Sequence, residues 1–191
     1  MSIYVVFFGG YKASKTDMEL WLTSARKQRD DVVFDAFPYP EGAGYKDTNA
    51  VDGFRKQFDG VIKKIEQSGA DTIYIVGHSS GSAIANELNS RLEGDHSHIT
   101  LVTLDGFRPT AGQIKKSNTQ VWSAVGAGGK GTSLNWSSSA TPYTATSATN
   151  KWSLHFSLVN TAVTDAIKSH DDITDGYAGC MSNLRWLEKK K

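Results

Sequence analysis

The stretch TIYIVGHSSGSAIA, residues 72–85, decides the fold of this chain. Its first part, which we place in a strand from Asp71 to Val76, is rich in β-branched and aromatic residues, as expected for a strand buried on both faces. A turn of glycines and serines follows, and apolar residues then recur at helical spacing in Ala83, Ile84, Ala85 and Leu88. A buried strand that turns directly into a helix is typical of a parallel sheet with crossover helices.

The rest of the chain alternates in the same way. Further strands are predicted at Ile3–Phe8, Val32–Phe37, His98–Leu104 and Gln120–Val125. Helices are predicted from a capping box at Ser14–Asp17 to about Gln28, over one continuous segment from Val51 to Ile65, and over Phe156–Ile167. Two segments stay open: Tyr143–Ser147 is a short strand or loop, and Asn183–Lys191 is helical or a frayed tail. The expected architecture is α/β, with helices on both faces of a mostly parallel sheet, in three layers.

The length and the net charge of the chain limit its possible functions. The 191 residues are expected to form one domain, residues 1–191. Twenty-one basic against 20 acidic side chains leave no excess charge to neutralise phosphates, so we expect a small-molecule substrate and no nucleic acid. A single cysteine, Cys180, a start without the pattern of a secretion signal and the lack of a long apolar run favour a cytoplasmic chain without a membrane span.

Residues 77–81, GHSSG, form a G-x-S-x-G motif between the predicted strand and helix. In that position a sharp turn lifts a serine hydroxyl above the edge of the sheet, and the start of the helix favours negative charge beside it. Ser79 is therefore a candidate nucleophile. The alternative is an ordinary glycine-rich turn in which Ser79 only caps the helix.

A serine nucleophile needs an imidazole base and a carboxylate that orients the base. His96 and His98 lie at the wrong end of a predicted strand, which leaves His155 as the base. No Asp or Glu occurs between Gly106 and Thr164, so Asp105, where the strand before it ends, is the expected acid. Asp105 could instead form an Asx turn with Gly106, and His155 could be a structural histidine.

The backbone N–H groups that would bind an oxyanion are expected from two loops. Ser80 supplies one because it follows the nucleophile, and Gly10, with Tyr11 next, supplies the other from the loop after the first strand. The glycines of that loop could also serve only a tight turn. Tyr11, Phe107, Trp136 and Tyr143 are candidate substrate-binding residues, although each could equally be ordinary packing.

These motifs resemble the α/β-hydrolases, and among them the thioesterase-like serine hydrolases. Gly77–Gly81 is similar to the GHSxG of that subgroup, Leu104-Asp105 to its leucine-aspartate pair, and His155-Phe156 to its histidine motif. The chain departs from the pattern at Ser82, where a second glycine is frequent, and at Ser153-Leu154 before the histidine. The resemblance implies a minimal α/β-hydrolase fold and acyl-transfer chemistry. We expect water to accept the acyl group and no cofactor or metal to take part. A fold of this kind that binds a ligand or partner without catalysis is the alternative.

Overall fold

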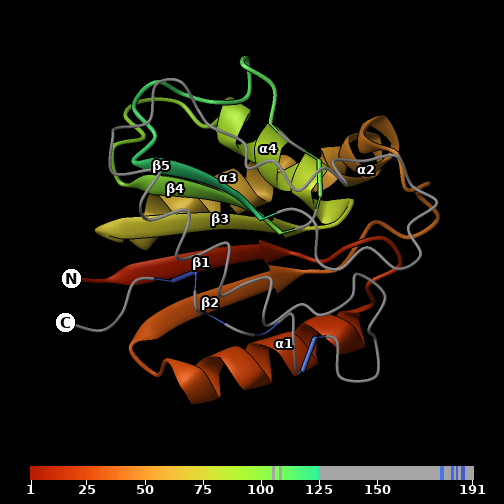
Figure 1. The fold of residues 1–191 in the computed structure, drawn as a ribbon, viewed down its shortest axis with the longest axis horizontal. Coiled ribbons are helices and arrows are strands. Elements are labelled where there is room, and N and C mark those ends of the chain that lie inside the picture. The colour runs from red at the N-terminus through yellow and green to blue at the C-terminus, as the bar shows by residue number, and fades with distance from the viewer. Residues whose placement is uncertain are drawn as a thin grey trace.

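The computed structural model describes residues 1–104, 106–107, 109–124, 177–178, 182, 184 and 186–187. Within them, one five-stranded sheet has the order β2-β1-β3-β4-β5, and every neighbouring pair is parallel (Figure 1). The strands are β1 Ile3–Phe8, β2 Val32–Phe37, β3 Thr72–His78, β4 Ile99–Leu104 and β5 Gln120–Ala124. The predicted bounds of all five are confirmed to within two residues.

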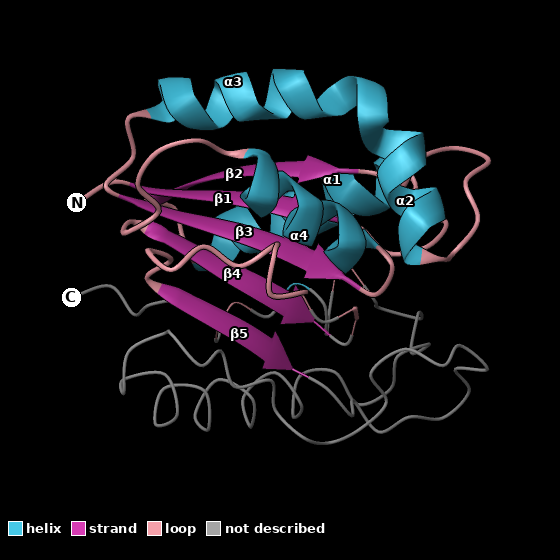
Figure 2. Cartoon of the chain, turned by 90° about the horizontal axis from the view of Figure 1, so that it is seen from above, coloured by secondary structure: helices cyan, strands magenta, loops and turns pink. Residues whose placement is uncertain are grey.

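Helices cover both faces of the sheet, which confirms the three-layer α/β prediction (Figures 1 and 2). They are α1 Lys15–Gln28, α2 Asp47–Phe54, the 3₁₀ turn η1 Arg55–Gln57, α3 Phe58–Ser68 and α4 Gly81–Arg91. Side chains of successive strand residues point to opposite faces. Phe7 accordingly stacks on Trp21 of α1 at 4.2 Å between ring centroids, whereas Phe8 meets Phe54 of α2 at 5.4 Å.

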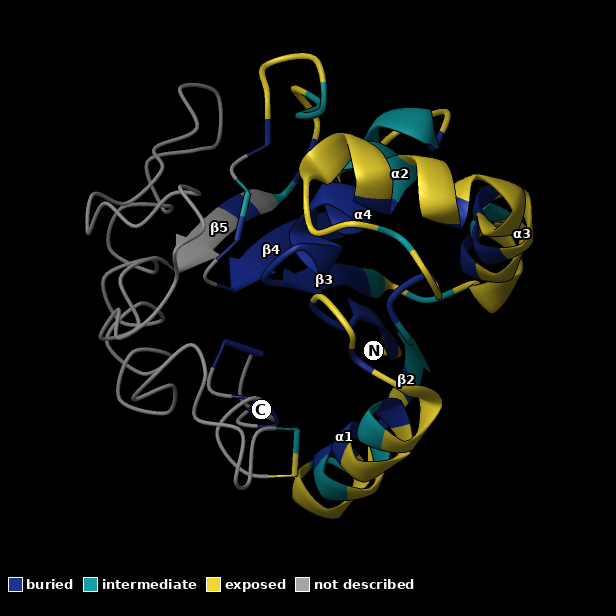
Figure 3. Ribbon diagram, turned by 90° about the vertical axis from the view of Figure 1, so that its right-hand side faces the viewer, coloured by how far each residue is buried: buried dark blue, intermediate teal, exposed yellow. Residues whose placement is uncertain are grey.

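Local sequence signals explain where α1 and β1 begin and end. Ser14 accepts a hydrogen bond from the Asp17 N–H, and the Asp17 carboxylate accepts one from the Ser14 N–H, so the predicted capping box is present. All six residues of β1 are buried, as its unbroken apolar sequence predicts for a strand covered on both faces. Figure 3 shows β3 and β4 mostly in dark blue, the colour of buried residues, so the core continues across the sheet.

The segment predicted as one helix is divided. The 3₁₀ turn η1 separates α2 from α3, and the buried rings of Phe54 and Phe58 on its two sides contact each other at 5.2 Å. Apolar spacings of three and four residues are compatible with both a continuous helix and two helices joined by a tighter turn. The expected continuous helix was therefore wrong, because packing of both rings against the core decides the direction of the chain.

The described residues near the carboxyl terminus are anchored and not frayed. Trp186 is buried and its ring lies 5.9 Å from Tyr74 of β3, on the same face as α1. Gln28 of α1 donates to the carbonyl oxygen of Ser182 over 2.7 Å. The predictions for Tyr143–Ser147 and Phe156–Ile167 concern residues outside those that the structure describes. None of the described helices is both long and apolar enough to cross a membrane.

Candidate active site at the carboxyl edge of the sheet

Ser79 occupies a strained turn between β3 and α4. Its φ angle is 51°, and Lys12 is the only other non-glycine residue with positive φ among those described. A residue with a Cβ atom in this left-handed region loses roughly 1–2 kcal/mol relative to the right-handed one. Strain of this kind is found preferentially where function requires a particular side-chain direction. The turn predicted around Ser79 is therefore present in its strained form.

The turn is packed tightly against the loop after β1. A Cβ atom on Gly81 would lie 2.3 Å from the carbonyl oxygen of Gly9, a backbone atom that cannot move aside. A Cβ atom on Gly10 would lie 2.8 Å from the Cβ of Ser79 and 2.9 Å from Nδ1 of His78. The two glycine-rich segments that the sequence analysis singled out are thus in direct contact, and a side chain at either glycine would separate them.

This contact lies at the topological switch point of the sheet. β1 and β3 are neighbours, but the chain leaves β1 toward α1 on one face and leaves β3 toward α4 on the other (Figure 1). In open parallel sheets, ligands bind outside the carboxyl ends of the strands at such a point. The same strand order also occurs in flavodoxin-like proteins, so the position of the crevice follows from the topology and its chemistry does not.

The predicted oxyanion donors differ in their surroundings. The Gly10 N–H donates to the hydroxyl oxygen of Tyr177 over 2.7 Å, so its hydrogen-bonding capacity is in use. Among the described residues, no partner is found for the N–H of Ser80 or of Tyr11. Ser80 precedes the first residue of α4, where backbone N–H groups are regularly left without helical partners. The Gly10 N–H thus has a hydrogen-bond partner within the chain, whereas those of Ser80 and Tyr11 have none among the described residues.

Tyr177 is a site residue that the sequence analysis missed. Its hydroxyl lies 2.9 Å from Nδ1 of His78, and its ring meets those of His78 and Phe7 edge-on. Burial raises the pKa of Tyr177, so the hydroxyl stays neutral. No motif or periodicity surrounds this residue in the sequence. Only long-range folding brings it to the turn of residues 77–81 around Ser79, which we call the elbow.

The loop after β4 reaches the elbow through Ser82. The Ser82 hydroxyl donates to the carbonyl oxygen of Ser79 over 2.5 Å and accepts from the Phe107 N–H over 2.7 Å. A Cβ atom on Gly106 would lie 2.3 Å from that same Ser79 oxygen. The two residues after Asp105 therefore touch the turn that holds Ser79. Asp105 itself lies outside the described residues.

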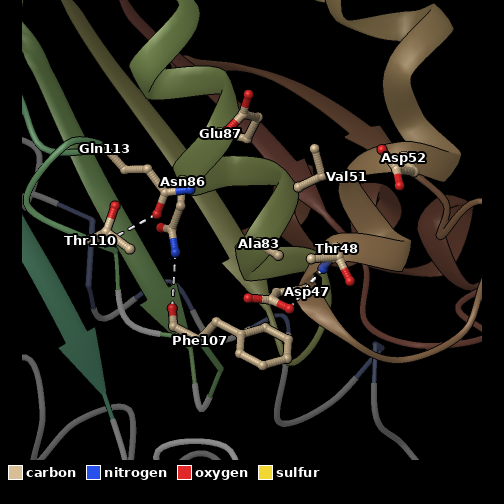
Figure 4. A pocket seen from close by; sticks show the side chains of 10 residues that line it. All are labelled: Asp47, Thr48, Val51, Asp52, Ala83, Asn86, Glu87, Phe107, Thr110 and Gln113. Atoms are coloured by element: carbon tan, nitrogen blue, oxygen red, sulfur yellow. Dashed lines mark hydrogen bonds between the residues drawn. The ribbon is translucent and has the colours of Figure 1, made fainter.

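Phe107 also lines a cavity of about 320 Å³ between α2, α4 and the loop after β4 (Figure 4). The side-chain amide of Asn86 donates to the Phe107 carbonyl oxygen over 3.0 Å and fixes this wall. Of the acidic residues here, Glu87 pairs with Arg91 and Asp52 with Arg55. The predicted substrate-binding residue Phe107 thus lies in a cavity wall, next to α4.

A larger cavity, of about 560 Å³, lies between the loops after β1 and β2. It is lined by Tyr11, Lys12, Ala13, Ser14, Lys15, Pro38, Tyr39, Pro40, Glu41, Gly42 and Ala43. We call it the tyrosine cavity. Its volume is in the range of small-molecule sites. Tyr11, predicted as a substrate-binding residue, is in its wall and is 39% exposed.

The tyrosine cavity borders the elbow through Tyr39, which lines the cavity and interacts with Ser80. The Ser80 hydroxyl donates to the carbonyl oxygen of Tyr45 over 2.7 Å, and the Tyr39 side chain interacts with Ser80 and donates to the Gly44 carbonyl oxygen. The ring of Tyr11 meets those of Tyr39 and Tyr45 edge-on. Burial raises the pKa of Tyr39 to about 12, so its hydroxyl is not a base at neutral pH.

Several predicted residues are not part of this description. His155, Trp136 and Tyr143, like Asp105, lie outside the described residues. His96 precedes β4 and lies at the amino end of the sheet, as predicted from the sequence, and so away from Ser79. His96 is fully buried and contacts Asn89 and the carbonyl oxygen of Leu92, so it supports the structure there.

Comparisons with known proteins leave the family open. No family model and no curated protein matches the chain. An extracellular α/β-hydrolase from a Paenibacillus species, described as sharing structural and functional homology with tobacco salicylic acid binding protein 2, aligns with 56% of this chain and 42% of its own at 18% identity and a TM-score of 0.39. CetZ from Methanosaeta thermophila strain DSM 6194 aligns with 60% of this chain and 40% of its own at 16% identity and a TM-score of 0.38. The alignments cover only about two fifths of each of these two proteins. Similarity at this level does not show which family the chain belongs to.

Proposed function

We propose that the chain is a serine hydrolase that cleaves a carboxylic ester or thioester through an acyl-enzyme on Ser79. One observation carries the proposal: Ser79 has a left-handed backbone at the carboxyl end of β3, directly before α4 and at the topological switch point. This conformation presents a serine hydroxyl above the edge of the sheet while the residue after it offers a backbone N–H.

The proposed reaction uses a triad of Ser79, Asp105 and His155. The Ser79 oxygen attacks the carbonyl carbon while His155 accepts its proton, and Asp105 orients the imidazole. The negative charge on the carbonyl oxygen is stabilised by the Ser80 N–H and by an N–H of the loop after β1. His155 then returns the proton to the departing alcohol or thiol. Water attacks the acyl group while His155 accepts a proton from it, and this proton passes to the Ser79 oxygen as the carboxylic acid leaves. Contacts of Gly106 and Phe107 with the elbow support the place given to Asp105.

The test is covalent labelling with a fluorophosphonate, followed by mass measurement of the intact protein and its peptides. One adduct on Ser79 is expected, with none on a folded Ser79→Ala protein. Ser80→Ala is the matched control, because this variant loses only the side-chain interactions of Ser80 with the Tyr45 carbonyl oxygen and with Tyr39 and keeps its backbone N–H. An adduct on another serine, or equal loss of labelling in Ser80→Ala, would remove Ser79 as the nucleophile.

A non-catalytic ligand-binding domain is the second candidate. Two features favour it. The Gly10 N–H is already hydrogen-bonded to the Tyr177 hydroxyl, and Ser79 is only 2% exposed, so neither is open to a substrate in this conformation. Hydrolysis of an ester and thioester panel of increasing acyl length separates the two, and it also tests the thioesterase-like assignment. Turnover that depends on Ser79 supports the hydrolase, whereas binding without turnover or labelling supports the domain without catalysis.

A further inference from the structure

The tyrosine cavity combines an aromatic wall with positive charge. Tyr11 and Tyr39 form its aromatic part together with Pro38 and Pro40, and three charged residues line it: Lys12, Lys15 and Glu41. Neither lysine has an ion pair among the described residues. The lining therefore carries a net charge of +1, and its two ammonium groups have no acidic partner in the part of the chain that the structure describes.

Lys12 is held in an unfavourable backbone conformation. The Ala13 N–H donates to the Gly10 carbonyl oxygen over 2.8 Å and closes a turn in which Lys12 has φ 63°. Positive φ at this turn position favours glycine, so a lysine here makes the turn less stable than it need be. The Lys12 ammonium lies 5.3 Å from the centre of the Tyr11 ring, at the cavity wall. The charge is thus placed beside the aromatic surface at the expense of turn stability.

Tyr39 connects the cavity to the residue after the proposed nucleophile. Ser80, which follows Ser79, is bonded to Tyr45 and interacts with Tyr39, and Tyr39 is itself part of the cavity wall. A substrate with its carbonyl group at Ser79 can therefore extend past Tyr11 into this space. The cavity lined by Phe107 has acidic residues and no basic residue in its lining, so it offers an anion no opposite charge.

We propose that the tyrosine cavity is a substrate subsite that binds an aromatic group carrying a carboxylate or another anion. The aromatic group packs against Tyr11 and Tyr39, and its negative charge lies between Lys12 and Lys15. The role of the cavity in the reaction rests on the proposed function, but its binding of aromatic anions does not. The two are tested separately by measuring binding in Ser79→Ala, which cannot form the acyl-enzyme.

The experiment compares 3-phenylpropionate with the uncharged 3-phenylpropionamide by titration calorimetry against the Ser79→Ala protein. The anion is expected to bind at least fivefold more tightly, and the difference should shrink as salt is raised from 0.05 to 0.5 M. Lys12→Gly and Lys15→Ala should each remove most of the difference, while Tyr11→Ala should weaken both compounds. Glu41→Gln should increase the preference for the anion, because it removes the one negative charge of the lining.

Lys27→Ala is the matched control. It removes one positive charge from the other end of α1, about 18 Å from Lys15 at the helical rise per residue, beyond the screening length of about 10 Å in 0.1 M salt. Lys12→Gly also controls for misfolding, because glycine suits the turn and should not lower stability. Equal binding of the two compounds, or a difference that survives Lys12→Gly and Lys15→Ala, would overturn the proposal even if Ser79 proves to be the nucleophile.

Discussion

The backbone N–H of Gly10 donates to the hydroxyl of Tyr177, 167 residues later in the chain, over 2.7 Å. A Cβ atom added to Gly10 would also lie 2.8 Å from the Cβ of Ser79. A hydroxyl oxygen from the carboxyl-terminal part of the chain is therefore bound beside the candidate nucleophile, where an N–H group was expected to face a substrate. The same hydrogen bond therefore affects both the stability of the folded chain and the access of a substrate oxygen to the Gly10 N–H.

Tyr177→Phe should lower stability and remove the hydrogen-bond partner of the Gly10 N–H. Removing the hydroxyl leaves a buried donor without its partner, which costs roughly 1–3 kcal/mol. Fluorophosphonate labelling of Ser79 should become faster, because the N–H is free to bind the phosphoryl oxygen. Tyr45→Phe is the control, since the Tyr45 ring is 41% exposed and its backbone carbonyl, not its hydroxyl, is bonded to Ser80. Equal unfolding free energies for Tyr177→Phe and the parent protein would contradict this prediction.

Gly81→Ala should disrupt the elbow. The added Cβ would lie 2.3 Å from the Gly9 carbonyl oxygen and 2.6 Å from that of Phe8, and both are backbone atoms. Overpacking of this kind costs about 3 kcal/mol. Gly60→Ala in α3 is the comparison, because nothing lies within 4 Å of its added Cβ and alanine favours a helix by roughly 0.5–1 kcal/mol. Urea unfolding should give effects of opposite sign, and a neutral Gly81→Ala would show that the loop after β1 yields easily.

Ser79→Gly should stabilise the protein and remove its activity. Glycine takes up the left-handed backbone of residue 79 without the steric cost of a Cβ atom, so the free energy of unfolding should rise by up to about 1 kcal/mol. Ser79→Ala keeps the Cβ atom and is expected to lose activity without this gain. Thermal and urea unfolding of both variants provide the check. A less stable Ser79→Gly protein would mean that side-chain contacts of Ser79 outweigh the backbone strain.

Asp105→Asn tests the proposed acid. Turnover of an ester substrate should fall by something near 10⁴-fold, as when the acid of a Ser-His-Asp triad is neutralised, with a much smaller change in KM. Asp95→Asn is the control, since this exposed carboxylate lies at the opposite end of β4. Nearly unchanged turnover in Asp105→Asn would place the acid elsewhere.

Stability should fall when the pH is lowered below about 6.5. Burial lowers the pKa of His96 below its ordinary value, and the nearby positive charges of Lys115 and His98 act in the same direction. The unfolded chain then binds a proton that the folded chain does not, so the contribution is intact above pH 6.5 and is lost as the pH falls toward the lowered pKa. Urea unfolding at pH 7.5 and 5.5 measures the difference. His96→Gln should reduce it, His98→Gln should do so less, and an unchanged pH dependence in His96→Gln would refute the assignment.

The architecture was predictable because its signals are local. An unbroken apolar strand such as Ile3–Phe8 and a capping box such as Ser14–Asp17 act over a few residues, and their bounds agree with the structure. Alternation of strands and helices favours a parallel sheet, because each crossover helix returns the chain to the edge where the preceding strand began. The same reasoning failed at η1. The spacing of apolar residues does not show where a helix is interrupted so that the rings of both Phe54 and Phe58 can pack in the same core.

The sequence by itself determined the sheet, the glycine-rich turn around Ser79 and the pairing of that turn with the loop after β1, because each follows from local propensity and the rule that parallel strands end at one edge. Only the tertiary structure decided that Tyr177 binds the Gly10 N–H, that Ser82 joins Ser79 to Phe107, and that Tyr11 and Tyr39 enclose a cavity with two lysines. The physical reason is that these contacts join residues with no common periodicity, so their positions are set by packing over the whole domain and not by any short stretch of the chain.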